Sequence, residues 1–125
     1  MQKMQNFKKS EFKCPCGCGL NFKDMSTEFV KKLDKARKFA DTPFNITSSI
    51  RCLDHNEYVG GSKTSSHLKG LAVDLSCGSP PKRFKIIKGL ILAGFNRIGV
   101  GEFFVHVDAD KTKLKNVIWR YKNEI

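Results

Sequence analysis

The segment SSHLKGLAVD, residues 65–74, sets a histidine and an aspartate seven positions apart around a glycine. Residues 71–76, LAVDLS, alternate apolar with small or polar side chains, which predicts a short strand whose three larger apolar residues face the core. Asp74 then lies on the opposite face, and His67 lies in the loop just before the strand. The spacing alone leaves two interpretations open: part of a metal site, or a loop histidine and a strand-end aspartate that makes a turn hydrogen bond.

A second predicted strand lies within EFFVHVDAD, residues 102–110, and carries another histidine. Its period of two separates an apolar set from a more polar set, Phe103, Val105 and Val107 against Glu102, Phe104, His106 and Asp108. An imidazole between carboxylates is costly to hold in a sheet unless the charges pair or bind a cation. His67, Asp74 and His106 are therefore candidate ligands, because a catalytic zinc site has three protein ligands and an open fourth position. The alternative is a half-buried His106 satisfied by Asp108.

The rest of the chain predicts an α+β order of elements. Residues 28–40 form an amphipathic helix, capped by Ser26 or Thr27. Its expected buried face consists of Phe29, Leu33, Ala36 and Ala40. Residues 42–50 alternate as a strand, and the polar, turn-forming residues 54–65 are expected to form a functional loop.

A second helix is predicted to open at Pro80 and Pro81 and to end near Gly94. Its expected inward-facing residues are Phe84, Ile87 and Ile91. RIGVG at residues 97–101 and VIWRY at residues 117–121 are two further predicted strands.

Length and charge limit the number of domains and the classes of partner. With 125 residues the chain is expected to be one domain, 1–125, with a cysteine-rich segment, 1–25, packed on it. The net charge of +11 comes from ten Lys/Arg against four acids in residues 1–40 and again in residues 82–125, whereas residues 41–81 carry three against four. This suits a polyanionic surface, although a merely well-solvated lysine surface fits the charge equally well. No pattern indicates specific nucleic-acid binding, and no apolar stretch predicts membrane insertion.

The five cysteines have two interpretations. Cys14, Cys16 and Cys18 are spaced by two, and with Cys52 or Cys77 they could build a second, structural metal site. Alternatively, Cys52 could pair with Cys77. The N-terminal stretch lacks the apolar core of a secretory signal, so we expect synthesis in the cytoplasm and reduced thiols.

Five ordered motifs resemble one enzyme family. They are FKCPCGCG (12–19), ITSSIRCLDHNEYVGG (46–61), SSHLKGLAVD (65–74), FNRIGVGEFFVHVDAD (95–110) and WRY (119–121). The third fits the S-x-H-x-x-G-x-A-x-D signature of the zinc D-alanyl-D-alanine carboxypeptidases and phage endolysins of the peptidase M15 family, and the set resembles its small single-domain branch from phages and prophages. The resemblance implies the hedgehog/D,D-peptidase fold, a small antiparallel sheet with flanking helices. It also implies one catalytic Zn²⁺ per chain, held by His67, Asp74 and His106.

The resemblance also implies roles for residues around the metal. Some relatives keep a carboxylate three residues before the second zinc histidine, but this chain has Phe103 there. Asp108 and Glu102 are the remaining candidates for the general base, and Asp108 could instead orient an imidazole. Arg51 is expected to bind a substrate carboxylate, and Ser66 and Asn56 to assist by hydrogen bonding.

The function expected from these features is hydrolysis of peptide bonds in bacterial peptidoglycan, as a D,D-carboxypeptidase or an endopeptidase, in phage or prophage lysis. The protein would act as a monomer on stem peptides at the cell wall or periplasm, released there by phage lysis machinery. The alternative is a non-catalytic, zinc-containing module that binds the cell wall, because Phe103 replaces a carboxylate. A nucleic-acid-binding protein that uses the cysteines and lysines is the third hypothesis.

Overall fold

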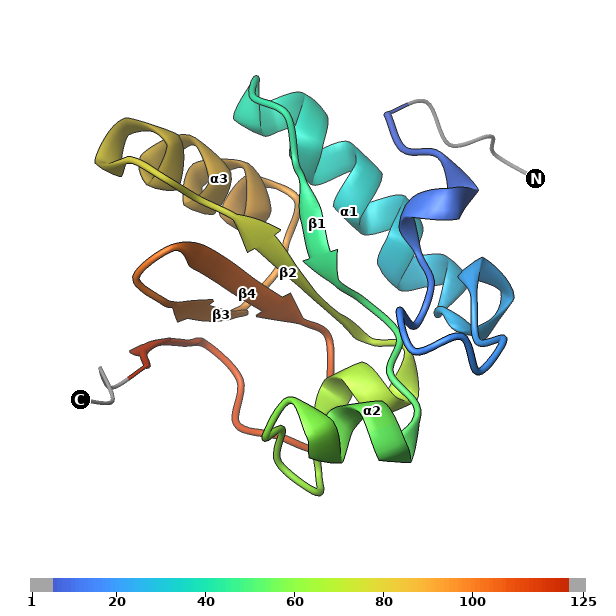
Figure 1. Ribbon diagram of the computed structural model, residues 1–125. Coiled ribbons are helices and arrows are strands. Elements are labelled where there is room, and N and C mark those ends of the chain that lie inside the picture. Colours follow the sequence, from blue (N-terminus) through green and yellow to red (C-terminus); the bar gives the residue numbers. More distant parts are fainter. Residues whose placement is uncertain (1–5, 122–125) are drawn as a thin grey trace.

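The computed structural model describes residues 6–121 (Figure 1). The single-domain prediction for 1–125 extends to residues 1–5 and 122–125, which lie outside the described residues. Between these limits the helices are α1 (Thr27–Ala40), α2 (Leu53–Tyr58) and α3 (Pro80–Leu92), and short 3-10 turns cover Lys9–Glu11, Phe22–Asp24 and Ser66–Lys69. The strands are β1 (Ile46–Ser48), β2 (Ala72–Ser76), β3 (Arg97–Val100), β4 (Phe104–Asp108) and β5 (Val117–Arg120).

The strands form one sheet in the order β1-β2-β4-β3-β5. β1, β2, β4 and β3 pair antiparallel with their neighbours, whereas β5 adds to the edge of β3 in the parallel direction. The expected α+β architecture with a small, mainly antiparallel sheet and flanking helices is confirmed. Strand β2 includes the end of SSHLKGLAVD, and β4 lies within EFFVHVDAD. Because these strands pair, the two motifs become neighbours in space.

Helices α1 and α3 lie side by side and cover one face of the sheet (Figure 1). Of the two residues predicted to cap α1, Ser26 is the N-cap, since its hydroxyl accepts a hydrogen bond from the Phe29 amide, and Thr27 is the first residue of the helix. A Cβ at Gly89 of α3 would lie 2.5 Å from the Ala36 carbonyl oxygen, so this glycine allows the close approach of the two helices. The sheet contributes to this core the apolar face of its central strands, namely Val73, Leu75, Ile98, Val105 and Val107.

The predicted inward face of α3 is wrong in two of its three residues. Phe84 and Ile91 are 67% and 51% exposed, and only Ile87 is partly buried against the core. Ile86 and Leu90 are buried instead, because the contact at Gly89 turns that side of the helix toward α1. Phe103 also departs from the expected strand pattern: it is 69% exposed because β4 begins one residue later.

The prediction of a loop across residues 54–65 is wrong in its first half, because α2 occupies Leu53–Tyr58. Its N-cap is a cysteine, whose sulfur accepts a hydrogen bond from the His55 amide. Cysteine is not among the usual capping residues, so the helix start carries no ordinary sequence signal. The turn after the helix contains Gly60 at φ +75°, a conformation that favours glycine.

The N-terminal segment packs on the same core as the helices. Phe7, Phe12 and Met25 are buried there, and the Phe7 ring lies 5.6 Å from the Phe12 ring and 6.4 Å from the Phe44 ring. Phe12 is completely buried, which fixes the chain just before the first of the cysteines. Among the described residues no helix has the length and hydrophobicity needed to cross a bilayer.

Candidate metal centre

Asp74 and His106 are direct cross-strand neighbours on the face of the sheet that α1 and α3 leave uncovered. The register of β2 and β4 pairs these two residues, while the apolar residues Val73 and Val107 pair on the core side. The Nδ1 atom of His106 lies 2.8 Å from Oδ1 of Asp74. Two of the three predicted ligands therefore meet because strand pairing puts them opposite one another.

His67 reaches the same point from the 3-10 turn before β2. The Ser65 hydroxyl caps this turn by accepting a hydrogen bond from the His67 amide, and Gly70 ends it at φ +68°. The imidazole Nε2 lies 3.3 Å from Oδ1 of Asp74. One ligand atom from each of His67, Asp74 and His106 lies within 4.8 Å of the others. The structure thus brings together all three residues that the sequence motifs predict.

The hydrogen bond on the far side of His67 decides which nitrogen faces the site. Its Nδ1 lies 2.8 Å from the carbonyl oxygen of Ser49, which can only accept, so Nδ1 must carry the hydrogen. In the neutral ring Nε2 then presents a lone pair toward Asp74 Oδ1, which is also an acceptor. Two facing acceptors need a cation or a proton between them. Two imidazole nitrogens and a carboxylate oxygen are a donor set that suits zinc, so these residues fit the metal that the motifs imply.

Asp108 lies behind His106 and contacts its other nitrogen. Oδ2 of Asp108 is 2.8 Å from His106 Nε2, and Oδ1 accepts a hydrogen bond of 2.6 Å from Arg97 Nε. The residue is 2% exposed and does not line the cavity described below. Such a carboxylate fixes the orientation of the imidazole and leaves Nδ1 directed at Asp74. Of the two roles considered for Asp108, the geometry favours the orienting one.

Electrostatic coupling in this group is strong. Burial alone would raise the pKa of Asp74, but hydrogen bonds from the protonated rings of His106 and His67 outweigh it and hold that pKa well below its usual value. Burial would lower the pKa of His106, yet Asp108 and Asp74 outweigh burial and raise it. Burial likewise opposes ionisation of Asp108, and the hydrogen bonds from His106 and Arg97 reverse this and lower its pKa. These pKa shifts therefore favour ionised Asp74 and Asp108 beside a positive charge at His106.

A cavity of about 320 Å³ opens above the three residues. Its polar lining includes Arg51, Ser66, Lys113 and Tyr121, and glycines 60 and 61 form part of its rim. Asp74 is the one carboxylate among the described lining residues. The opening is of the size at which proteins bind small ligands, and two of its side chains are cationic.

Arg51 is held by three side chains at the wall of this cavity. It donates from Nε to Ser48 Oγ at 2.9 Å, from Nη1 to Asn56 Oδ1 at 3.2 Å and from Nη2 to Asp74 Oδ2 at 3.4 Å. Burial lowers the pKa of its guanidinium and the Asp74 carboxylate partly offsets this. Asn56 is itself buried and does not line the cavity, so it contacts Arg51 from behind. Ser66 does line the cavity, but its hydroxyl donates to Asp110 at 2.8 Å.

Glu102 lies away from the other predicted site residues. It is exposed, in the bend before β4, and it does not line the cavity. Its backbone carbonyl accepts a hydrogen bond of 2.9 Å from Arg83 Nη2. The alternation of a strand places a side chain over the site only within the strand itself. Strand β4 starts two residues after Glu102, so the alternation does not apply to Glu102.

Three features of the site were missed by sequence reasoning. Asp110 is 2% exposed and ties the turn of His67 to the end of β4 through Ser66 and through Lys69 Nζ at 3.0 Å. Trp119 lies with its ring 5.7 Å from the His106 ring. Gly99, directly opposite His106, leaves the space for it, because a Cβ there would lie 2.8 Å from Trp119 Cε2. An isolated glycine within a predicted strand was the available signal for such a close approach.

The cysteines divide into a group of four and a single residue. Cys14, Cys16, Cys18 and Cys52 gather at the surface beside the start of α2, with their sulfur atoms within 4.8 Å of one another. Cys77 is buried elsewhere, and its thiol donates to the Ser79 carbonyl oxygen at 3.5 Å. The structure therefore joins Cys52 to the N-terminal cysteines and separates it from Cys77.

Comparison with known proteins gives one family. No curated protein matches the chain. A family model described as peptidase M15 matches residues 5–108, a span that includes His67, Asp74 and His106 together with the four grouped cysteines. The match covers most of the chain and agrees with the family that the ordered motifs resemble. On this ground, and with the predicted ligands brought together on one sheet face, the chain belongs to the peptidase M15 family.

Proposed function

We propose that this protein is a zinc-dependent peptidase that hydrolyses peptide bonds in the stem peptides of bacterial peptidoglycan. The observation that carries the proposal is the convergence of His67 Nε2, His106 Nδ1 and Asp74 Oδ1 at the floor of a polar cavity. Membership of a peptidase family supports the reaction class, and the donor set supports zinc.

The three ligand residues would hold the ion through the atoms that already face one another. A zinc ion there supplies a Lewis acid that polarises a carbonyl group and lowers the pKa of water toward neutrality. Asp108 fixes the ring of His106 by accepting from Nε2–H, and the Ser49 carbonyl fixes the ring of His67 in the same way. Asp74 presents Oδ1 to both imidazoles while its Oδ2 accepts from Arg51.

Substrate recognition is proposed for the cationic side of the cavity. Arg51 and Lys113 line it, and a guanidinium held by Ser48 and Asn56 can bind a carboxylate with little loss of side-chain freedom. Stem peptides carry such carboxylates at their ends and side chains. Hydrolysis at the end of the peptide would make the enzyme a carboxypeptidase, and hydrolysis within a cross-link an endopeptidase. We propose action at the cell wall during phage or prophage lysis, which suits a cationic protein on an anionic envelope.

A non-catalytic, zinc-containing wall-binding module is the second candidate. Its support is that Asp74, a proposed ligand, is the one carboxylate among the described residues lining the cavity. A peptidase needs a group that accepts the proton of water and passes it to the leaving amine. Glu102 and Asp108 would have to perform that step from outside the cavity lining.

The test combines metal content, wall clearing and product mass. Purified wild-type protein and His67→Ala are compared for bound zinc and for clearing of a cell-wall suspension, with His55→Ala as control because His55 is the histidine outside the site. We expect wild type and His55→Ala to clear the suspension and His67→Ala to lose both clearing and one zinc ion. Mass spectrometry of digested muropeptides then distinguishes removal of a terminal residue from cleavage of a cross-link. Loss of zinc from His67→Ala with no turnover by wild type would favour the binding module.

A further inference from the structure

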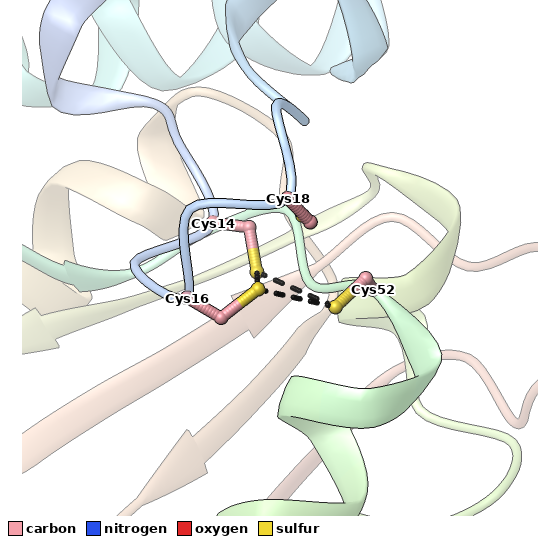
Figure 2. A group of neighbouring side chains, drawn as sticks. All are labelled: Cys14, Cys16, Cys18 and Cys52. Atoms are coloured by element: carbon pink, nitrogen blue, oxygen red, sulfur yellow. Dashed lines mark hydrogen bonds between the residues drawn. The ribbon is translucent and has the colours of Figure 1, made fainter.

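We propose that Cys14, Cys16, Cys18 and Cys52 form a second, structural zinc site, distinct from the His67, Asp74 and His106 centre. Figure 2 shows the sulfur atoms of Cys14, Cys16 and Cys52 directed toward one another, with Cys18 beside them. The first three cysteines belong to one short loop, whereas Cys52 comes from a different part of the chain. The inference does not depend on the proposed function, because none of these cysteines lines the catalytic cavity.

The sulfur–sulfur distances fit tetrahedral coordination. The Sγ atoms of Cys14 and Cys16 are 3.5 Å apart, those of Cys14 and Cys52 are 3.8 Å apart, and those of Cys16 and Cys52 are 3.4 Å apart. Four sulfurs placed tetrahedrally at about 2.3 Å from a zinc ion would be separated by about 3.8 Å. A disulfide requires about 2.05 Å, so none of these pairs is bonded. The three sulfurs form a triangle of the size of one face of a zinc–thiolate tetrahedron, and Cys18 is within reach of the fourth corner.

The backbone of the loop is folded to hold its cysteines in this arrangement. A hydrogen bond of 3.0 Å from the Cys14 amide to the Leu20 carbonyl closes the loop at its base. Gly17 and Gly19 alternate with the cysteines and adopt φ +84° and +96°, values that ordinary side chains rarely reach. The loop therefore curls within a few residues, and the sulfurs of Cys16 and Cys18 return to the side where Cys14 lies.

The composition of the group points to a structural site. Four cysteines leave no open position for water or substrate, which is the arrangement of closed zinc sites. Cys16 and Cys18 are exposed, so an ion can enter from solvent, whereas Cys14 is buried and joins the loop to the core. Four thiolates also favour zinc over calcium or magnesium, which prefer oxygen ligands.

An ion at this position would join the N-terminal cysteine loop to the start of α2, two segments that lie far apart in the sequence. The cysteine loop follows Phe12, which is completely buried. Cys52 is the N-cap of α2, next in sequence to Arg51, and Asn56 of the same helix accepts a hydrogen bond from Arg51. The site would thereby fix the start of α2 and, through it, one wall of the catalytic cavity.

The test measures zinc in purified full-length protein that lacks the catalytic ligand His67. In reducing buffer, we expect His67→Ala to retain one zinc ion per chain. Adding Cys16→Ser and Cys18→Ser, which alter exposed residues, should abolish that zinc, whereas adding Cys77→Ser, which alters the cysteine outside the group, should leave it bound. Circular dichroism of each variant establishes that it is folded. Because His67 is absent throughout, failure of the catalytic site to bind zinc does not affect this result.

A second measurement identifies the ligands. Cobalt bound in place of zinc to His67→Ala should give intense near-ultraviolet absorption from thiolate-to-metal charge transfer, and this band should vanish with Cys16→Ser and Cys18→Ser. The proposal is overturned if folded His67→Ala binds no zinc from excess in reducing buffer, or if its cobalt form lacks the charge-transfer band. It is also overturned if mass spectrometry of protein purified with zinc finds the four cysteines joined in disulfides.

Discussion

Asp108 and Asp110 lie two positions apart at the end of β4, yet they stabilise different parts of the site. Asp108 contacts the His106 ring and Arg97, while Asp110 contacts Ser66 and Lys69 beside His67. Each of the two candidate ligand histidines therefore has a buried carboxylate near it that comes from the same strand end. Since neither aspartate lines the cavity, their effects should be measured first on metal affinity and stability.

Asp108→Asn and Glu102→Gln are predicted to separate orientation from proton transfer. Asp108→Asn weakens the acceptor for His106 Nε2–H, so zinc affinity should fall about 10–100-fold, with activity partly restored by excess zinc. If Glu102 is the base, Glu102→Gln should retain zinc while kcat falls about 10²–10⁴-fold. Zinc titration and kcat at saturating zinc check both. A variant of Asp108 that keeps its zinc affinity but loses kcat would instead assign proton transfer to Asp108.

Asp110→Asn is predicted to lower stability in a pH-dependent way. Burial would raise the pKa of Asp110, but hydrogen bonds from Thr112, Ser66 and Lys69 outweigh it and lower the pKa below the unfolded value. The carboxylate therefore stabilises the fold at neutral pH, and this contribution is lost as the pH falls below about 4. We expect the variant to lose about 1–3 kcal/mol of unfolding free energy at pH 7 and the difference to shrink in acid.

Urea unfolding of both proteins between pH 7 and pH 3 measures this difference. Asp54→Asn is the matched control, because Asp54 is an exposed carboxylate in α2. It should change stability little at any of these pH values. A difference between wild type and Asp110→Asn that is independent of pH would show that Asp110 contributes by packing and not by its charge.

Strand β5 can pack close to the site because Gly99 on β3 has no side chain. Gly99 faces Trp119 and Tyr121, and a Cβ at Gly99 would lie 2.6 Å from Tyr121 Cε2. Both aromatic rings lie near His106, at 5.7 Å and 6.3 Å between ring centroids. The Arg97 guanidinium is 4.9 Å from the Trp119 ring on the same edge of the sheet. The parallel pairing of β5 therefore places aromatic rings on one side of the candidate metal centre.

Gly99→Ala is predicted to displace these rings. The added methyl group cannot fit without movement of Trp119, so we expect a loss of about 1–3 kcal/mol and a shifted fluorescence spectrum from the single tryptophan of the chain. Gly78→Ala is the control, since a Cβ there would meet no atom within 4 Å. Equal stability and unchanged fluorescence in Gly99→Ala would mean that β5 does not pack against β3 as described.

The three helices show which kinds of prediction succeed from sequence. The four residues predicted for the buried face of α1 are all buried, because its apolar residues recur at helical spacing; Val30 is buried as well. In α3 apolar residues occur on several sides, and the buried side was decided by Gly89, whose contact with Ala36 is tertiary. Helix α2 was missed because its cap is a cysteine. Local patterns thus predict elements, but not contacts whose partner lies far along the chain.

The same limit applies to the two groups of candidate metal ligands, whose members come from distant parts of the chain. Strand parity indicated which residues of β2 and β4 face away from the core, and His67 was a candidate because it lies just before β2. The motif resemblance then implied that His67, Asp74 and His106 are the ligands. Only the register of the strands shows that Asp74 lies opposite His106. For the cysteines, spacing suggested a group but not whether Cys52 or Cys77 would complete it. That choice depends on where α2 begins relative to the N-terminal loop.

The lysine-rich surface that would attract an anionic wall lies away from the cavity where the chemistry is proposed. Exposed lysines lie on α1 and α3, among them Lys31, Lys35, Lys38, Lys85 and Lys88. These helices cover the face of the sheet opposite the candidate metal centre. Among the described residues that line the cavity, only Arg51 and Lys113 are cationic. Long-range attraction to an anionic wall can therefore act over surfaces that take no part in binding one stem peptide.

Clearing of cell walls is accordingly predicted to be more sensitive to salt than cleavage of a small soluble muropeptide. Exposed charges are screened over about 8 Å at physiological ionic strength and over about 3 Å at 1 M, so attraction of the +11 protein to the wall should weaken as salt is added. Arg51 is partly buried, so its contact with one substrate carboxylate is screened less. Rates on both substrates, measured from low to high sodium chloride with zinc held saturating, test this difference. A parallel decline on wall and soluble peptide would instead indicate that salt acts at the cavity, and that the lysines of α1 and α3 only keep the protein in solution.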